Sequence, residues 1–394
     1  MESIALNKMG EALDLPDTAY EAAKSRYEDL GTWFERPESD SSAHDPHIFA
    51  QGSFRLGTAI RPLDSSETYD LDLACKLREG ITKTTHTQKS LKALIGKDLE
   101  SYRQARNIKS PLEPKHRCWR LEYQDGYNFH MDIVPCIPAG SDRQFMIKEA
   151  MIRSGEEAHA SQRDAELAVT ITDDRRVGYD QICDDWLVSN PEGYAKWFES
   201  RMRLCGSYLT ERARMVKAAQ IDDLQYYQWK TPLQRCIQLL KRHRDTMFQN
   251  NADSKPISAI ITTIAARAYQ GELDIGTAMT TILANMERFV RSTNPRVPNP
   301  VNPSEDFADR WSMQKYTRLQ LEGNFRRWIV AAKADFATIS ESRDASFVVK
   351  QASSKFALSL NESTLRAAIG ASTTPLLYTP KTHSITDSSK PWGN

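Results

Sequence analysis

The segment Tyr69-Asp-Leu-Asp-Leu73 contains two carboxylates, Asp70 and Asp72, at positions that differ by two. In an extended chain such residues point to the same side, so both carboxylates lie on one face and the leucines on the other. Two carboxylates this close raise each other's pKa, and a cation between them relieves the repulsion. Hard oxygen ligands with open positions suit Mg²⁺, which keeps several waters and shares phosphate oxygens. The spacing therefore predicts a divalent-cation site on a half-buried strand.

A third carboxylate, Asp132, stands in a second alternating segment, residues 127–133, on the same side as Asn128 and His130. If the two strands are neighbours, Asp132 joins the first pair, and three carboxylates can hold two divalent ions about 3.5–4 Å apart. One ion then lowers the pKa of an attacking hydroxyl, and the other stabilises a departing pyrophosphate. We expect two Mg²⁺ ions, with Mn²⁺ as a substitute, and Asp132 nearest the attacking hydroxyl.

A glycine–serine step, Gly52-Ser53, precedes the acidic pair by about seventeen residues. Glycine lets backbone amides approach a phosphate, and the serine hydroxyl adds a donor to a terminal phosphate oxygen. Arg55 and Arg61 supply positive charge nearby. A D-x-D pair or a Gly-Ser step alone is common on protein surfaces. Their combination with a distant third aspartate indicates phosphoryl transfer by positioning and charge rather than by covalent catalysis.

The elements that must position these residues are strands followed by helices. Alternation over residues 70–77 and 119–137 predicts strands, and Asp125-Gly126 between alternating runs predicts a hairpin. A helix is predicted before the strands, ending near Phe34, and apolar periodicity predicts helices after about residue 190: 232–248, 257–269, 276–291 and 307–339. Four prolines exclude a continuous helix over 295–303. The order of elements predicts a mixed α+β fold.

Composition narrows the class of protein. The chain has 394 residues, with 52 Lys+Arg against 52 Asp+Glu, which argues against a protein that coats nucleic acid by bulk charge. Six cysteines without CxxC spacing argue against a disulfide framework. The first residues do not form a signal peptide, and no apolar run reaches the ~18 residues of a membrane span. We expect a cytoplasmic protein with reduced thiols and no membrane partner.

At these residues the sequence resembles the polymerase-β-type nucleotidyltransferases, whose signature is Gly-Ser, D-x-D and a distant third aspartate. More narrowly, it resembles the bacterial CD-NTases of CBASS anti-phage systems, which are related to cyclic GMP-AMP synthase and oligoadenylate synthetase. The resemblance covers roughly residues 15–340. It is carried by Gln51–Ile60, Tyr69–Leu73, His130–Pro135, Thr231–Asp245, Lys255–Ser258, Asn299–Pro303 and Phe307–Trp311.

The resemblance implies a polymerase-β-like core with a mixed sheet, a C-terminal helical domain and an active site in the cleft between them. We expect the core and an N-terminal spine helix in residues 1–200, the helical domain in 201–371 and a flexible tail in 372–394. The family implies successive use of two nucleoside triphosphates, ATP, GTP or both, with release of pyrophosphate. The product is a cyclic di- or trinucleotide messenger, which a downstream effector protein detects in anti-phage defence.

The family's functional residues can be assigned to positions of this sequence where its motifs match. The resemblance implies that Asp70, Asp72 and Asp132 are catalytic and hold the metals. It implies that the triphosphate is bound by Gln51, Gly52, Ser53 and Arg55, with Lys241 and Ser258 closing on the phosphates from the helical side. Helical spacing places Lys241 on a polar face with Gln234, Gln238 and Asp245. A lysine beside Arg242, His243 and Arg244 is more often part of a solvated basic turn, and this reading stays open.

Some alternatives stay open. The histidines and cysteines form no cluster at zinc-ligand spacing. We therefore do not expect the zinc-binding insert with which the animal cyclic GMP-AMP synthase binds DNA, nor activation by DNA. The C-terminus could be conjugated or bind a regulatory partner. The same fold could make linear oligonucleotides or transfer nucleotides to RNA or protein. A non-catalytic binding protein is a third reading, against which the three carboxylates count. The bases, the ring size and the linkage stay undetermined.

Overall fold

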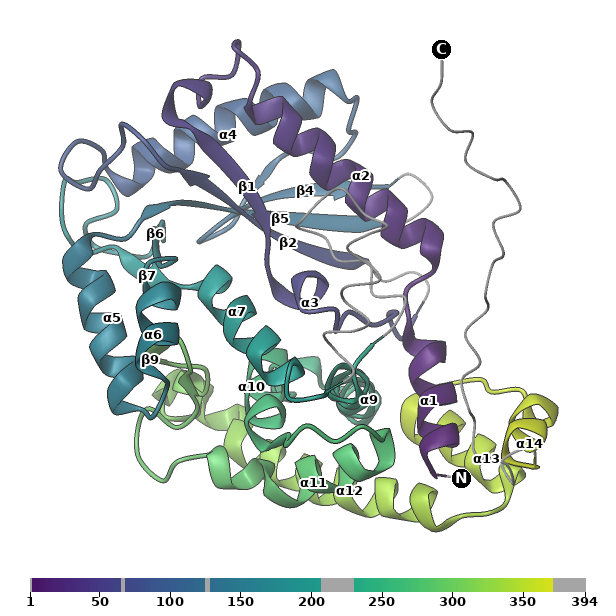
Figure 1. Cartoon of the computed structure of the whole chain (residues 1–394). Coiled ribbons are helices and arrows are strands. Elements are labelled where there is room, and N and C mark those ends of the chain that lie inside the picture. The colour runs from purple at the N-terminus through teal and green to yellow at the C-terminus, as the bar shows by residue number, and fades with distance from the viewer. Residues whose placement is uncertain (1, 65–67, 125–127, 207–229, 371–394) are drawn as a thin grey trace, which may run out of the picture.

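The computed structural model describes residues 2–64, 68–124, 128–206 and 230–370. Its centre is a mixed sheet (Figure 1). The strand order is β1-β2-β5-β4-β3, with β6 pairing with β5 and β7 pairing with β6. The bounds are β1 Pro46–Ala50, β2 Tyr69–Leu77, β3 Glu113–Pro114, β4 Trp119–Tyr123, β5 Phe129–Pro138, β6 Val169–Ile171 and β7 Leu187–Ser189. β2 and β5 are parallel, and the other pairs are antiparallel.

Alternation in β2 and β5 sets which face of the sheet is buried. Leu71, Leu73 and Cys75 of β2 and Met131 and Ile133 of β5 are all fully or almost fully buried. They pack in one hydrophobic cluster with helices α2 (Asp17–Phe34) and α4 (Gln88–Ala105). Both helices cover this face of the sheet in Figure 1. The polar residues between them in sequence therefore lie on the opposite face.

The remaining helices lie on the other side of the sheet (Figure 1). They are α1 Glu2–Leu13, α3 Gly52–Arg55, α5 Ser141–Arg153, α6 Ala158–Ala165, α7 Pro191–Met202, α9 Pro232–Met247, α10 Ser258–Ala268, α11 Ile275–Asn285, α12 Leu321–Glu341, α13 Ala345–Phe356 and α14 Glu362–Gly370. Short 3₁₀ helices are η1 Ser42–His44, η2 Ala252–Ser254, η3 Met286–Phe289, η4 Asp309–Trp311 and η5 Gln314–Leu319, and β8 Pro298–Asn299 pairs with β9 Asn302–Asp306. No described helix combines the length and the apolar character that a membrane crossing needs.

Helix α9 is central to this second half of the molecule. It begins with a capping box, in which Thr231 and Gln234 satisfy each other's backbone amides, and has Pro232 in its first turn. Its apolar residues Leu233, Ile237 and Leu240 are fully buried. They belong to a cluster that also contains residues of α1, α5, α7 and α10–α13. Elements from both ends of the chain therefore pack around this one helix.

The predicted α+β fold is confirmed, and most predicted elements are present. The hairpin strands β4 and β5 pair, although Asp125 and Gly126 lie outside the described residues. The helix expected from Phe307 begins only at Leu321, because Gln320 has a left-handed backbone conformation (φ 47°) that ends the preceding turns. The division at residue 200 stays a prediction, and the tail predicted for 372–394 lies outside the described residues.

Candidate active site

The glycine–serine step forms the one-turn helix α3 directly beside β2. The Gln51 amide donates to the Asp72 carbonyl at 2.9 Å, and the Gln51 side chain donates to the Leu73 carbonyl at 3.2 Å. Gly52 has φ +64°, and a Cβ at this position would overlap the Asp72 carboxylate. Only glycine meets both conditions without strain. The turn therefore holds Ser53 against the strand that carries the acidic pair.

The predicted third carboxylate lies beside that pair. In the parallel register of β2 and β5, Asp72 is opposite Asp132, and Asp70 is opposite His130. On the other side of β5, antiparallel β4 places Arg120 opposite Asp132. The polar face of the sheet therefore has a cross-strand row of Asp72, Asp132 and Arg120. The structure brings together the three aspartates that the sequence placed far apart.

The surroundings of Asp72 disfavour the charged form of its carboxyl. Burial raises its pKa to about 7, and the nearby charges of Asp70 and Asp132 add to the rise, opposed by those of Lys241 and Arg120. Asp70 is well exposed. A half-buried carboxyl between two like charges is a site that favours a cation. Its residue types, hard carboxylate oxygens facing a cleft, fit Mg²⁺ or Mn²⁺.

Asp132 is engaged by an arginine that the sequence reasoning did not identify. Arg120 Nε donates to Asp132 Oδ1 at 2.7 Å, and a terminal nitrogen of Arg120 donates to Oδ2 at 2.6 Å. Among the residues that the structure describes, no three acidic, histidine or cysteine side chains form a ready metal cage. A carboxylate oxygen that accepts one hydrogen bond still has lone pairs for a second ligand. The D-x-D pair is therefore open to a cation, and Asp132 shares its oxygens with Arg120.

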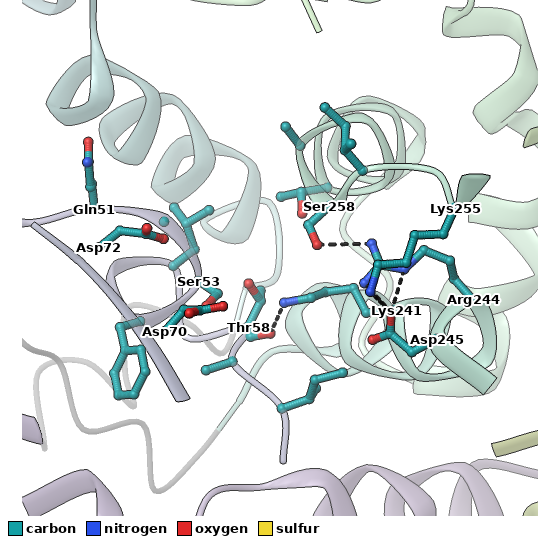
Figure 2. Close-up of a pocket in the computed structure, with 18 of the residues that line it drawn as sticks. Gln51, Ser53, Thr58, Asp70, Asp72, Lys241, Arg244, Asp245, Lys255 and Ser258 are labelled. Carbon is teal, nitrogen blue, oxygen red and sulfur yellow. Dashed lines mark hydrogen bonds and ion pairs between the residues drawn. The ribbon is translucent and has the colours of Figure 1, made fainter. Parts of the chain in front are cut away.

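A cleft of about 1100 Å³ runs between the sheet and the helices. Figure 2 shows two groups of side chains facing each other across it. One group, on the sheet side, consists of Gln51, Ser53, Asp70 and Asp72; the other, on the helical side, consists of Lys241, Arg244, Asp245, Lys255 and Ser258. Asp132 is not among the residues that line the cleft. Carboxylates on one wall and cationic side chains on the other are the arrangement that a metal-bound polyphosphate requires.

On the helical side, the Lys241 ammonium donates to the Thr58 carbonyl at 2.9 Å. Burial, with the neighbouring Arg244, lowers the pKa of Lys241 to about 8. Arg244 donates to the Ser258 hydroxyl at 3.0 Å and also pairs with Asp245, which Lys255 contacts at 3.1 Å. The structure thus brings Lys241 and Ser258 to the cleft, as the sequence predicted. It also adds Arg244, whose position in a basic run gave no separate signal.

Arg55 lines the same cleft but already has a partner. It donates to the carboxylate of Glu199 on α7 at 2.9 Å. The Glu199 side chain is 2% exposed and the Arg55 side chain is 13% exposed. Part of the positive charge expected to act on a phosphate is therefore balanced by this carboxylate.

Another part of the cleft is lined by aromatic and polar side chains. Tyr194 and Phe307 line it, with ring centroids 6.0 Å apart, and the Tyr194 hydroxyl lies 2.8 Å from that of Thr263. Glu305 also lines it and accepts a hydrogen bond from Asn299 at 2.7 Å. Burial raises the pKa of Glu305. The two rings lie edge to face, with an angle of 80° between their planes. Aromatic surface beside hydrogen-bonding groups is typical of sites that bind a small heterocycle.

The mixed sheet, the glycine–serine turn and the D-x-D strand together define a polymerase-β-type nucleotidyltransferase. In line with this, the family model for the nucleotidyltransferase domain of cyclic GMP-AMP synthase DncV-like proteins matches residues 46–135. The chain is also 30% identical over 314 residues to a c-di-GMP synthase of Roseivirga ehrenbergii, covering 78% of this chain and 72% of that protein. The chain therefore belongs to the DncV-like nucleotidyltransferases, the CD-NTase family of cyclic dinucleotide synthases.

Two further comparisons concern a relative from Bradyrhizobium diazoefficiens. The chain is 26% identical over 318 residues to its cyclic dinucleotide synthase CdnG, covering 76% of this chain and 67% of that protein. The structure of that CdnG in complex with GTP superimposes with a TM-score of 0.62 at 20% identity, covering 94% of this chain and 98% of the other. The E. coli MS115-1 CdnC–HORMA complex gives a TM-score of 0.55 at 15% identity, covering 89% and 96%. These superpositions confirm the fold, and the family confirms that the protein is an enzyme.

Proposed function

We propose that this enzyme joins two nucleoside triphosphates, at least one of them GTP, into a cyclic dinucleotide. The observation that carries the proposal is the cleft with Ser53 and the D-x-D pair on one wall and Lys241 and Ser258 on the other. A triphosphate between these walls has donors on its phosphate oxygens from both sides. The c-di-GMP product named for the Roseivirga relative supports GTP as a substrate.

The reaction at each step is a displacement at phosphorus. A ribose hydroxyl oxygen of one nucleotide bonds to the α-phosphorus of the other, the bond to the bridging oxygen breaks, and pyrophosphate leaves. Ser53 and Lys241 hold the leaving phosphates. The proton of the attacking hydroxyl is released to water on the side of Asp132, whose two oxygens accept from Arg120. A second displacement within the linear intermediate closes the ring. The protein contributes orientation and charge and forms no covalent intermediate.

We propose that two Mg²⁺ ions, replaceable by Mn²⁺, occupy the face formed by Asp70, Asp72 and Asp132. Bound there, the ions supply charge neutralisation on the leaving pyrophosphate and a lower pKa for the attacking hydroxyl. The raised pKa of Asp72 supports this assignment, because uncompensated carboxylates at this spacing repel. Chelation by EDTA should abolish turnover, and added Mg²⁺ or Mn²⁺ should restore it. Full turnover in EDTA would contradict the metal assignment.

The central experiment is product analysis. The protein is incubated with labelled GTP and ATP and Mg²⁺, treated with phosphatase, and the products are identified by mass spectrometry. We expect a phosphatase-resistant cyclic dinucleotide, absent in the double variant Asp70→Ala/Asp72→Ala and retained in Asp180→Ala, an exposed acid outside the cleft. Undiminished product in the double variant would contradict the proposal. Phosphatase-sensitive or macromolecule-linked label would favour the alternative, linear synthesis or transfer to RNA or protein.

We also propose a residue that favours guanine. Glu305 is a hydrogen-bond acceptor in the lining of the cleft. Guanine presents two adjacent N–H donors on its Watson–Crick edge, which one carboxylate accepts together, whereas adenine presents only one. In competition between GTP and ATP, Glu305→Gln should therefore shift incorporation towards ATP. An unchanged base composition of the product would remove Glu305 from this role.

The messenger is proposed to act in anti-phage defence through an effector protein that binds it. The family resemblance supports this role. Phage plating on cells that carry the gene with its genomic neighbours should fall, and plating should recover with Asp70→Ala/Asp72→Ala. Equal protection by the inactive enzyme would contradict a messenger role.

A further inference from the structure

The polar face of α9 is buried. The side chains of Gln234, Gln238, Lys241 and Arg242, here called the α9 polar stripe, recur at helical spacing along one side of the helix. They are between 0% and 6% exposed. Buried donors of this kind need hydrogen-bond partners, because an unsatisfied buried polar group is destabilising. The partners of the stripe therefore indicate what this face of the helix is for.

Each member of the stripe donates to a backbone carbonyl of one short segment, residues 56–62, and Gln238 also donates to Asp14 at 3.2 Å and accepts from Arg235 at 3.2 Å. Gln234 Nε2 donates to the Leu56 carbonyl at 2.9 Å, and Gln238 Nε2 donates to the Ala59 carbonyl at 2.8 Å. Lys241 donates to the Thr58 carbonyl, and Arg242 to the Arg61 and Pro62 carbonyls. Four successive side chains of the stripe thus bind five carbonyls of residues 56–62. They bind the main chain, so they fix its path whatever side chains it carries.

Residues 56–62 continue directly from the Ser53 turn. The Thr58 amide donates to the Ser53 carbonyl at 2.9 Å, and the Leu56 amide donates to the Gly52 carbonyl at 3.2 Å. At the other end, the Arg61 amide donates to the Leu13 carbonyl at 3.0 Å. A displacement of this segment would therefore move Ser53 relative to α9, which carries Lys241. The two sides of the phosphate site are joined through these carbonyl contacts.

The members of the stripe differ in their access to substrate. Lys241 lines the cleft, whereas Gln234 and Gln238 do not. A phosphate oxygen entering the cleft can therefore compete with the Thr58 carbonyl for the lysine ammonium, and charge favours the phosphate. The two amides lie behind the cleft and are neutral. Their bonds to residues 56–62 remain when the lysine changes partner.

We propose that Gln234 and Gln238 are positioning residues for the triphosphate: they hold residues 56–62 on α9 so that Ser53 and Lys241 contact the same phosphates. This inference rests on the proposed function. It predicts that loss of either amide donor weakens triphosphate binding even though neither side chain touches the nucleotide. It also predicts that the main chain of residues 56–62 becomes more mobile.

Variants at Gln234 test the positioning role, because the oxygen and the nitrogen of its side-chain amide bind different partners. Its oxygen accepts from the Thr231 amide in the capping box, and its nitrogen donates to Leu56. Gln234→Glu keeps the capping oxygen and removes the donor, and Gln234→Met removes both without adding charge. Thr231→Ala is the matched control. It removes the cap hydroxyl, which also donates to Gln234 Oε1 at 3.1 Å, and it leaves the Thr231 amide on that oxygen and the Nε2 donor in place. Gln238→Met is the second site, should the Gln234 variants not fold.

The readouts are the Kd of a non-hydrolysable GTP analogue with Mg²⁺ and hydrogen exchange of the amides of residues 56–61. Gln234→Glu, Gln234→Met and Gln238→Met should each raise Kd about three- to tenfold and speed exchange. Thr231→Ala should lower the Tm while leaving both readouts unchanged. Unchanged Kd in Gln234→Met, or an equal Kd rise in Thr231→Ala, would overturn the proposal.

Both readouts are independent of turnover. If the wild type makes no cyclic product but the Kd and exchange changes occur, the proposed function fails and the positioning role stands. If cyclic product forms and these variants bind the analogue like the wild type, the positioning role fails and the proposed function stands.

Discussion

The charge of Lys241 depends on pH in a range where the enzyme can be assayed. Its pKa is lowered to about 8 by burial and by Arg244, so the ammonium is protonated below that pH and becomes neutral above it. Only the protonated form attracts phosphate. The family motif indicated a lysine at this position, but its buried setting could not be predicted, because a run of basic residues looks the same on a surface.

A pH dependence of binding follows. The KM for the triphosphate should rise as the pH increases through about 8, because the fraction of charged Lys241 falls there. Lys241→Arg should remove this rise, since a guanidinium stays charged throughout the range. The measurement is KM from pH 7 to 9.5 for both proteins. A flat profile for the wild type would contradict the assignment of Lys241 to the phosphates.

Gly52 gives a second prediction for a single residue. Gly52→Ala adds a Cβ at a positive φ and against the Asp72 carboxylate, so the turn must shift away from the strand. We expect kcat/KM to fall roughly a hundredfold, or about 2.7 kcal/mol of transition-state stabilisation. Gly31→Ala on α2 is the control, because an added Cβ there meets no atom within 4 Å. Equal activity of the two variants would contradict this account of the turn.

Secondary-structure elements were predictable where the apolar pattern was regular. Alternation identified β2 and β5 and also their polar faces, because strands expose alternate residues. Which groups the side chains of a polar face would contact was not predictable. Arg120 lies opposite Asp132 only through the β4–β5 register, and the α9 polar stripe binds backbone carbonyls, which have no sequence signature.

The central packing of α9 leads to a prediction for this element. Leu240 is fully buried, so Leu240→Ala leaves a cavity and should lower the free energy of unfolding by about 2–5 kcal/mol. Val330→Ala on α12, where the side chain is 64% exposed, should change it by less than about 0.5 kcal/mol. Urea unfolding followed by circular dichroism measures both. A loss below 1 kcal/mol for Leu240→Ala would show that α9 is not packed as described.

At the scale of the whole molecule, a few polar contacts join the sheet half to the helical half beside the cleft. The pair between Arg55 on α3 and Glu199 on α7 is one of them. This pair could not be predicted, because its two residues are 144 positions apart in the chain and no motif links them. The fold class was predictable from element order, but these connections depend on the tertiary arrangement.

Removal of one partner tests how strongly this pair contributes. Glu199→Ala leaves the largely buried Arg55 guanidinium without its carboxylate, which should lower the free energy of unfolding by about 3 kcal/mol. The double variant Arg55→Met/Glu199→Leu should lose less, because the buried guanidinium is removed together with its partner. Arg203, 3.7 Å from Glu199, also loses a contact, but its side chain is 48% exposed and stays solvated. Thermal or urea denaturation compares the variants. Equal losses in the single and double variants would contradict a paired, desolvated contact.

The parallel pairing of β2 and β5 has a consequence for how the acidic face arises. Asp72 and Asp132 become neighbours only when two strands with a long crossover between them have aligned, and such non-local pairing is intrinsically slow. Until these strands pair, a nascent or truncated chain has two acidic strands but no complete acidic face. The proposed metal site therefore depends on the pairing of both strands and not on either strand alone.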